Sequence, residues 1–322
     1  MKTTGPQPSA DAMLVRELLE GGDAFVSGDR LARLLGVSRA AVLKRVRSLE
    51  ASGFVVDHRR GAGYRLVRVP TEPVACFIEA ELLRAGLSLE VAVYDELEST
   101  QEVALAKDVS GRSGCLFVAR VQKKGRGRFG RAWLSPLGGL WMSLASPVSY
   151  EEVEPGVMTM GAGAAVVEVL CNEGIPALLK WPNDIMLADR KAGGILVTLV
   201  SEGPVATKVV FGVGLNVNVD KTDLAPLEGS ATSILIETGM VLPLSPLCAR
   251  VTRALVELVG NLSKEAVRDR ARAVMWGVGR RVTVSLPDGT LREGVIRGID
   301  DDFGLVLERD GEVWVVRSGE VL

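Results

Sequence analysis

The 322-residue chain is predicted to be a multi-domain α+β protein, and three observations support this. The first 69 residues are basic and helical, with 12 Lys and Arg against 7 Asp and Glu, whereas the remaining 253 residues hold 26 against 33. The middle of the chain mixes helices with strands joined as hairpins, which favours α+β over a doubly wound parallel sheet. The end of the chain alternates through short strands and turns. A basic end on an acidic body indicates different partners for the two parts.

Residues 1–69 have the pattern of a winged helix-turn-helix domain. Met13–Gly21 is an amphipathic helix, Ser27 or Asp29 can cap a second helix, and Ser38 can cap a third after a turn at Gly36. The stretch "VVDHRRGAGYRL" then alternates through a glycine turn, as the two strands of a wing do.

Basic side chains of the third helix and the wing predict DNA binding. The candidate DNA-binding residues are Ser38, Arg39, Lys44, Arg45 and Arg47 near the major groove, and Arg59 and Arg60 on phosphates. A solvated helical face is the alternative, since three-helix units also serve as dimerisation modules. DNA binding is favoured because turn, cap, basic helix and wing occur in order.

The prolines of "VRVPTEPV" (Val67–Val74) predict a linker to a middle domain, residues 72–271. The expected strands there are Glu90–Tyr94, Cys115–Val121, Leu140–Ser146, Ala192–Ser201 and Val205–Val219, with a buried helix over 155–174. The short "EGP" between the last two strands predicts an antiparallel hairpin. Residues 276–322, with turns at "PDG", "DDDFG" and "RDG", predict a small SH3-like β-barrel.

The stretch Gln122–Trp133, "QKKGRGRFGRAW", packs five cations and three glycines into a connection between two predicted strands. Glycines let main-chain N–H groups approach an anion closely, and arginines offer forked donors to phosphate or carboxylate. A solvated basic loop and a nucleic-acid patch are the alternatives. Neither a P-loop nor a Rossmann pattern is present.

Four motifs in order carry a family resemblance: "GRGRFGR" followed by Trp133, "KWPND" (Lys180–Asp184), "DRKAGGILV" (Asp189–Val197) and "GVGLNVNV" (Gly212–Val219). Together with "EST" (Glu98–Thr100), they resemble the motif set of biotin protein ligases. With the winged helix in front and the barrel behind, the whole chain resembles the bifunctional type, ligase and biotin-operon repressor together. The chain departs from the pattern at Gln101, where the family usually has Asn, and at Thr198, where an acidic residue often stands.

The resemblance implies an activity, cofactors and partners. The middle domain would have the ligase-like α+β fold with a mixed sheet. It would activate biotin with ATP and magnesium to biotinyl-5′-adenylate and pass biotin to a specific lysine of a biotin carboxyl carrier protein. The adenylate-bound protein would form a homodimer that represses transcription at biotin operon DNA. A cytoplasmic location without a membrane partner is expected.

The resemblance also implies roles for particular residues. Biotin would be contacted by Ser99, Thr100, Gln101, Gln122, Gly125, Arg126, Gly127, Arg128 and Lys191. ATP or the adenylate would be contacted by Arg131, Trp133, Lys180, Asn183, Asp184 and Asn216. Lys191, Arg126 and Arg128 are the catalytic candidates, and Asp184 is a candidate magnesium ligand. Alternatively, Trp133 and Trp181 are plain core, and Lys180 and Lys191 are surface charges.

The remaining residues limit the chemistry. A carboxylate with a pKa of about 4 is ionised at neutral pH, so its attack on phosphorus needs no general base. The single histidine, His58, lies in the wing, which excludes a Ser-His or Cys-His nucleophile from the middle domain. Four widely spaced cysteines indicate buried thiols in a reducing compartment. Residues 1–13 lack the apolar run of a signal peptide.

Three rival functions remain open. The first is a DNA-binding sensor without catalysis, against which the basic stretch argues. The second is a lipoate ligase, whose family lacks "GRGRFGR" in this form. The third is a ligase whose Gln101 has changed the substrate.

Overall fold

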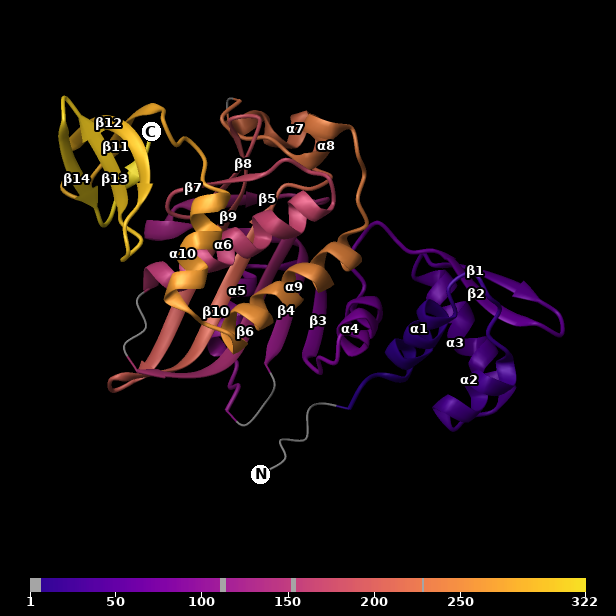
Figure 1. Cartoon of the computed structure of the whole chain (residues 1–322). Helices are drawn as coiled ribbons and strands as arrows, with labels where there is room; N and C mark the ends of the chain where they lie inside the picture. Colours follow the sequence, from indigo (N-terminus) through magenta and orange to yellow (C-terminus); the bar gives the residue numbers. More distant parts are fainter. Residues whose placement is uncertain (1–6, 111–113, 152–154, 228) are drawn as a thin grey trace.

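A computed structural model describes residues 7–110, 114–151, 155–227 and 229–322 (Figure 1). The first six residues of the stretch in which no signal peptide is expected lie outside the described ones. The chain forms a helical N-terminal domain with a hairpin, a central layered domain and a small C-terminal sheet, which confirms the predicted multi-domain α+β class.

The N-terminal domain is a winged helix-turn-helix, as predicted. Its elements are α1 (Ala10–Gly21), α2 (Gly28–Leu35), α3 (Arg39–Ala51), β1 (Val55–Arg59) and β2 (Gly63–Arg68). Ser27 caps α2 and Ser38 caps α3 by accepting a hydrogen bond from a main-chain N–H, so Asp29 is not the cap. Gly36 ends α2 in the left-handed region, at φ 64°. Helix α1 begins earlier than predicted because Ser9 caps it.

The predicted linker is held at both ends and is not a free tether. Strand β2 runs to Arg68, so the start of the linker belongs to the wing. The Thr71 carbonyl accepts a hydrogen bond from the Leu244 N–H (2.8 Å), and the Val74 N–H donates to Ser245 Oγ (2.8 Å). The proline-containing segment is therefore a connection that is hydrogen-bonded to the central domain.

Helix α4 (Ala75–Arg84) belongs to two cores at once. Phe77 and Ala80 pack into the N-terminal core, whereas Ile78 and Leu82 pack into the central one. Helix α1 lies alongside α4 in Figure 1, and Ser9 binds the carboxylate of Glu79 through its main-chain N–H (2.8 Å). The N-terminal domain is thereby fixed to the central domain through α4.

The central domain is built on a mixed sheet of eight strands in the order β3-β4-β6-β10-β9-β8-β7, with β5 on β4. Strands β3 and β4 are parallel, and the other pairs are antiparallel. The predicted hairpin around "EGP" is confirmed as β9 and β10. The strands are β3 (Glu90–Leu97), β4 (Cys115–Arg126), β5 (Ala132–Ser135), β6 (Leu140–Glu151), β7 (Leu178–Lys180), β8 (Asp184–Leu187), β9 (Arg190–Glu202) and β10 (Val205–Leu215).

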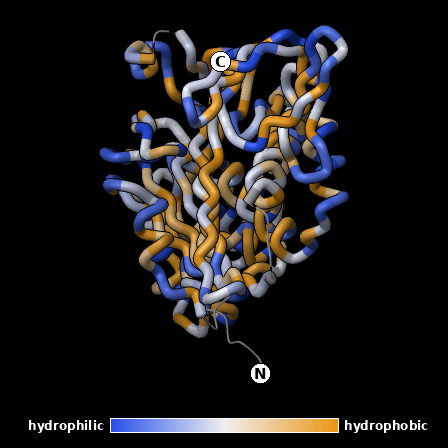
Figure 2. Tube along the Cα trace, turned by 90° about the vertical axis from the view of Figure 1, so that its left-hand side faces the viewer, coloured by the Kyte–Doolittle hydropathy of each residue, from blue (hydrophilic) through white to orange (hydrophobic). Residues whose placement is uncertain are grey.

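Helices cover the two faces of this sheet unequally. On one face α6 (Pro155–Asn172), the buried helix predicted from the sequence, packs on β9, and α9 (Leu244–Gly260) packs on β6. Leu116 and Val118 of β4 belong to the same hydrophobic core. On the other face α5 (Thr100–Ala106) packs against the alternate β4 residues, Cys115 and Phe117. Figure 2 shows the apolar trace concentrated in the interior. Because α5 is short, it covers only part of this face of the sheet. The candidate site lies on the uncovered part.

The C-terminal domain is a small antiparallel sheet in the order β14-β13-β12-β11-β15, following α10 (Lys264–Ala273). Its core is continuous with that of the central domain, and Trp181 Nε1 donates to the Phe303 carbonyl across the boundary (2.9 Å). Its strands are β11 (Arg281–Ser285), β12 (Leu291–Ile299), β13 (Leu305–Arg309), β14 (Glu312–Val316) and β15 (Glu320–Val321). The short helices α7 (Lys221–Leu224) and α8 (Ile234–Thr238) precede α9.

Two smaller sequence predictions have different outcomes. The four cysteines are free thiols, but Cys171 is exposed at the end of α6 and is not buried as expected. Within the described ranges, no helix is both long and apolar enough to cross a lipid bilayer.

Candidate functional site

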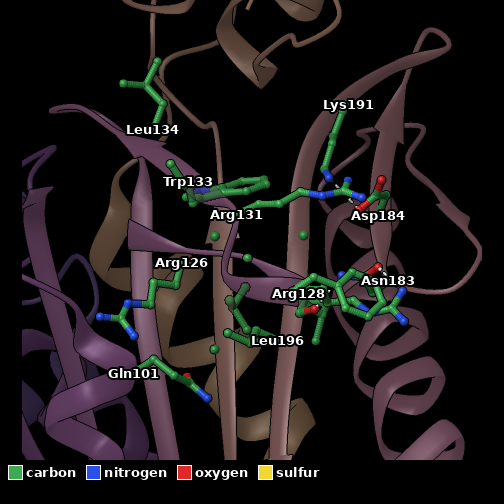
Figure 3. A pocket seen from close by; sticks show the side chains of 18 of the residues that line it. Gln101, Arg126, Arg128, Arg131, Trp133, Leu134, Asn183, Asp184, Lys191 and Leu196 are labelled. Atoms are coloured by element: carbon green, nitrogen blue, oxygen red, sulfur yellow. Dashed lines mark hydrogen bonds and ion pairs between the residues drawn. The ribbon is translucent and has the colours of Figure 1, made fainter. Parts of the chain in front are cut away.

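The uncovered face of the central sheet holds a cavity of about 250 Å³, bounded by β9, β10, the start of α5 and the β4–β5 hairpin. Figure 3 shows Gln101 at one end and Arg131, Lys191 and Asp184 at the opposite end. The cavity therefore has an uncharged polar end and a charged end.

The motifs that the sequence singled out converge on this cavity. Most of the residues predicted to hold biotin or nucleotide line it: Ser99, Thr100, Gln101, Gln122, Arg126, Gly127, Arg128, Arg131, Trp133, Asn183, Asp184, Lys191 and Asn216. Gly125 and Lys180 are the two that do not line it. Residues of the four motifs therefore lie around one cavity. Their ion pairs and hydrogen bonds were not given by the motifs.

The glycine- and arginine-rich stretch is a β-hairpin rather than an open loop. Strand β4 continues to Arg126 and pairs with β5, with Gly125 opposite Trp133, so the connection shrinks to 127–131. A Cβ on Gly125 would lie 2.5 Å from the Trp133 carbonyl oxygen. This glycine thus permits close strand pairing and does not contact the cavity. At the tip, exposed Phe129 adopts φ 58°.

Carboxylates neutralise four of the five cations in this hairpin. The ion pairs are Lys123–Glu96 (2.6 Å), Lys124–Glu98 (2.7 Å), Arg126–Glu102 (2.7 Å) and Arg131–Glu320 (2.5 Å). Arg126 points away from the cavity in Figure 3, toward the side of α5. This pairing removes the excess positive charge that a nucleic-acid patch would need.

Arg128 is the exception among the five. It is half-buried at the cavity, and among the described residues no carboxylate lies within ion-pair distance of it; its Nη1 donates to Asn183 Oδ1 at 3.5 Å. Burial lowers the pKa of its guanidinium, and the charges of Asp184 and Glu320 act in the opposite direction. A partly desolvated cation whose contacts are a neutral amide and the Phe129 ring (4.9 Å), with no carboxylate in the described part of the chain, is a natural position for an anionic ligand group.

Lys191 and Asp184 form the other charged pair of the cavity. Lys191 Nζ lies 2.7 Å from the Asp184 carboxylate and 5.2 Å from the centre of the Trp133 ring. Lys180 lies behind this pair, with its Nζ 5.3 Å from the Trp276 ring. Burial lowers the pKa of Lys180, while Asp184 acts to raise it. Lys191 thus lines the cavity, whereas Lys180 lies outside it and contacts Trp276.

Trp133 lies flat on a floor made by two glycines of adjacent strands. A Cβ on Gly214 would come within 2.7 Å of the indole Nε1, and one on Gly194 within 3.4 Å of the ring. The indole Nε1 is buried and has no hydrogen-bond partner among the described residues. The ring is therefore not plain core, because it forms a cavity wall with an unused donor.

The two asparagines of the predicted nucleotide set make main-chain contacts. Asn183 Nδ2 donates to the Ile195 carbonyl (2.8 Å), and Asn216 Nδ2 donates to the Thr232 carbonyl (2.9 Å). Both amides fix the chain around the cavity. Asn183 keeps its oxygen toward Arg128.

A chain of hydrogen bonds forms the uncharged end of the cavity. Gln122 Oε1 accepts from the Thr100 N–H (2.8 Å), Thr100 Oγ1 lies 2.9 Å from Ser143 Oγ, and Ser143 Oγ donates to Gln101 Oε1 (3.1 Å). Gln101 Nε2 then donates to Thr198 Oγ1 (3.2 Å). The two positions at which the sequence departs from the motif pattern are therefore in direct contact.

Comparison with known proteins matches the three parts of the chain to three family models. The Biotin/lipoate A/B protein ligase family matches residues 95–216, an HTH domain matches 13–65, and the Biotin protein ligase C terminal domain matches 277–322. The Bifunctional ligase/repressor BirA of Salmonella typhimurium is 33% identical over 94% of this chain and 94% of that protein. The chain belongs to the biotin protein ligase family.

Two further relatives cover less of the chain. The biotin–[acetyl-CoA-carboxylase] ligase of Mycobacterium tuberculosis is 32% identical over 75% of this chain and 92% of that protein. A solved biotin protein ligase from Aquifex aeolicus, in complex with biotin and ATP, is 27% identical, with a TM-score of 0.60 over 72% of this chain and 97% of that one.

Some cavity residues of this biotin protein ligase escaped the sequence reasoning. Ser143 lies between apolar Met142 and Leu144 on β6, and its alternation to the face that holds Phe117 and α5 was the available signal. Gly319, Glu320 and Val321 enter from the C-terminal sheet. Nothing local to their sequence indicated that they reach a cavity in another domain.

The predicted DNA-binding residues of this ligase lie on α3 and the wing, away from the cavity. Lys44 and Arg47 are exposed, and so are Arg59 and Arg60 on the wing. Ser38 is exposed at the α3 N-terminus, Arg39 pairs with Asp29, and Arg45 pairs with Asp11 of α1 (2.7 Å). The pair with α1 restrains Arg45, and Arg59 stacks on the Phe25 ring (4.7 Å). Lys44, Arg47 and Arg60 are therefore the freest candidates for phosphate contact.

Proposed function

We propose that this protein activates biotin with ATP to biotinyl-5′-adenylate and transfers biotin to a lysine of a biotin carboxyl carrier protein. The observation that carries the proposal is Arg128, a half-buried cation without a carboxylate partner among the described residues, beside a cavity with one uncharged polar end. Biotin has the same asymmetry, a neutral ureido ring and an ionised carboxylate. The names of the relatives support the proposal.

In the first step, a carboxylate oxygen of biotin attacks the α-phosphorus of ATP. The bond from that phosphorus to the bridging oxygen breaks, and pyrophosphate leaves with the electron pair. The carboxylate is already ionised, so the protein supplies position and positive charge rather than a base. Arg128 and Lys191 would hold the charge that builds up on the carboxylate and phosphate oxygens.

In the second step, an uncharged lysine amine of the carrier attacks the carbonyl carbon of the mixed anhydride. The carbon–oxygen bond to phosphate breaks, AMP leaves, and the new amide nitrogen loses a proton. The adenylate must stay away from water between the two steps. The hairpin tip, 127–131, joined through Arg131 to Glu320 of the C-terminal sheet, is placed to close the charged end.

Magnesium fits the donors present, because it is usually held by one or two carboxylates together with substrate phosphates. Asp184 is the candidate carboxylate ligand, and it also forms an ion pair with Lys191 (2.7 Å). Bound there, magnesium would neutralise phosphate charge and orient the leaving pyrophosphate. Within the described ranges, no cluster of three potential ligands suggests a metal site made by protein alone.

The positions of the remaining residues along the cavity indicate which part of biotin or of the nucleotide each would contact. Ser99, Thr100 and Gln101 would take the ureido ring. Trp133 would stack on a planar group of the nucleotide, with its unpartnered Nε1 available to an acceptor. Asn183 and Asn216 would shape the nucleotide end through the main chain that they fix.

Pyrophosphate release with biotin, ATP and magnesium tests the activation step. The proposal expects release that depends on biotin and is absent with lipoate. A noncatalytic sensor would bind biotin without release, and a lipoate ligase would prefer lipoate. Release with neither acid, despite binding, would refute the activity.

We also propose that the winged domain represses transcription at biotin operon DNA, in the cytoplasm, as a homodimer favoured by the adenylate. A single winged domain offers few phosphate contacts, so tight binding at physiological salt needs two copies on one operator. Because coupling is reciprocal, DNA should also strengthen adenylate binding. A titration of the full chain with its biotin-operon promoter should show tighter binding with biotin and ATP. Equal affinity with and without them would refute the regulatory part.

A further inference from the structure

Gln101 reaches across the uncharged end of the cavity because β10 has a glycine beneath it. Gln101 as a residue is 7% exposed, and a Cβ on Gly212 would lie 2.5 Å from Gln101 Oε1. Figure 3 shows Gln101 extending toward the strands at the end opposite Lys191 and Asp184. The long side chain therefore occupies space that a larger residue at 212 would fill.

The carboxamide of Gln101 is held at both of its polar atoms. Its oxygen accepts from Ser143 Oγ of β6 (3.1 Å), and its nitrogen donates to Thr198 Oγ1 of β9 (3.2 Å). A carboxamide carries two N–H donors, and Thr198 uses one of them. The second N–H is left for a ligand acceptor at the uncharged end of the cavity.

Thr198 does not line the cavity itself. It is half-buried on β9, two residues beyond the cavity residue Leu196 and on the same face of the strand. Its contact with the site passes through Gln101. Without an acceptor at 198, the carboxamide could rotate and present its oxygen to the ligand instead of its nitrogen.

We infer, on the basis of the proposed ligase function, that Thr198 is a positioning residue for recognition of the ureido ring. It holds the Gln101 carboxamide so that its free N–H meets the ureido oxygen, while the neighbouring hydroxyls accept from the ureido N–H groups. The Gln101–Thr198 pair thus selects a cyclic urea over a ring without that acceptor. The two sequence departures act together as one recognition unit.

Thr198→Val tests this in the full-length protein, because it replaces the hydroxyl with a methyl group of similar size. The KM for biotin in pyrophosphate release should rise roughly three- to tenfold, the range for one neutral hydrogen bond. The KM for ATP and kcat should stay at wild-type values, and Thr198→Ser should restore the KM for biotin. Thr207→Val is the matched control, since Thr207 Oγ1 on β10 donates to the Val200 carbonyl (3.4 Å) and lies outside the cavity.

A double-mutant cycle separates positioning from direct contact. In a Gln101→Ala background, Thr198→Val should raise the KM for biotin no further. A further rise there would overturn the inference, because Thr198 would then act on the ligand without Gln101. An unchanged KM in Thr198→Val alone, with wild type active on biotin, would also overturn it. An inactive wild type would instead refute the proposed function.

Discussion

Replacing Arg128 with alanine removes the hairpin cation that faces the cavity without a carboxylate partner among the described residues. Removing one preorganised donor from such a site costs about 2.7–4 kcal/mol, or about 100- to 1000-fold in rate. Because Arg128 is half-buried and still screened by solvent, we expect the lower end, a roughly 100-fold slower single-turnover release of pyrophosphate. The adenylate should also dissociate faster and label stray lysines nearby.

Lys123→Ala is the matched control for Arg128→Ala. It removes the same charge from the same hairpin, but Lys123 is exposed, pairs with Glu96 (2.6 Å) and does not line the cavity. A solvent-screened surface pair outside the cavity does not act on the reacting groups, so pyrophosphate release should change less than about fivefold. Equal effects of the two substitutions on release and on adenylate dissociation would refute the assignment of Arg128 to the ligand.

Three further predictions follow from the same contacts. Lys191→Ala should slow pyrophosphate release about 100-fold or more, because it removes a cation at the reacting groups and leaves Asp184 unpaired; near-normal release would make Lys191 a surface charge. The hydrogen bond from Arg131 lowers the pKa of Glu320 below its ordinary 4.5, so this pair is intact above that pH and is lost as pH falls through the lowered pKa. Protection factors of the amides at 127–131, which correct for the slower intrinsic exchange at low pH, should therefore fall on acidification in the wild type but stay constant in Glu320→Gln, and identical profiles would show that the Arg131–Glu320 pair does not hold the hairpin tip. A truncation starting at Thr71 should still activate biotin but should melt at a lower temperature, because it exposes Phe77 of α4; an unchanged melting temperature would show that the shared core is unimportant.

The family resemblance named residues that the structure brings to one cavity, and each motif lies where a strand begins or ends beside the open face of the sheet. "KWPND" precedes β8, "DRKAGG" opens β9 and "GVGLN" closes β10. Antiparallel pairing of β9 with β8 and β10 then brings these stretches together. Local patterning alone gave the β9–β10 hairpin, because these two strands are neighbours in the sequence, whereas the resemblance supplied the site residues.

The charge state of the hairpin could not be predicted, because its partners are distant in the chain. Glu320 lies 189 residues from Arg131, and Glu102 meets Arg126 only after α5 folds back on the sheet. Composition counts cations but not their neutralisation, so the stretch looked more basic than it is. The shared core through Phe77 was hidden for the same reason, since proline spacing marks a connection but not what packs on it.

The most direct test of the central claim is transfer of biotin to a carrier domain, followed by mass spectrometry. The full chain is incubated with biotin, ATP, magnesium and a biotin carboxyl carrier domain, and each of biotin and ATP is omitted in turn. The account predicts one biotin on one carrier lysine, only when both are present, and much less with Arg128→Ala. Binding of both ligands without transfer to the carrier would contradict it.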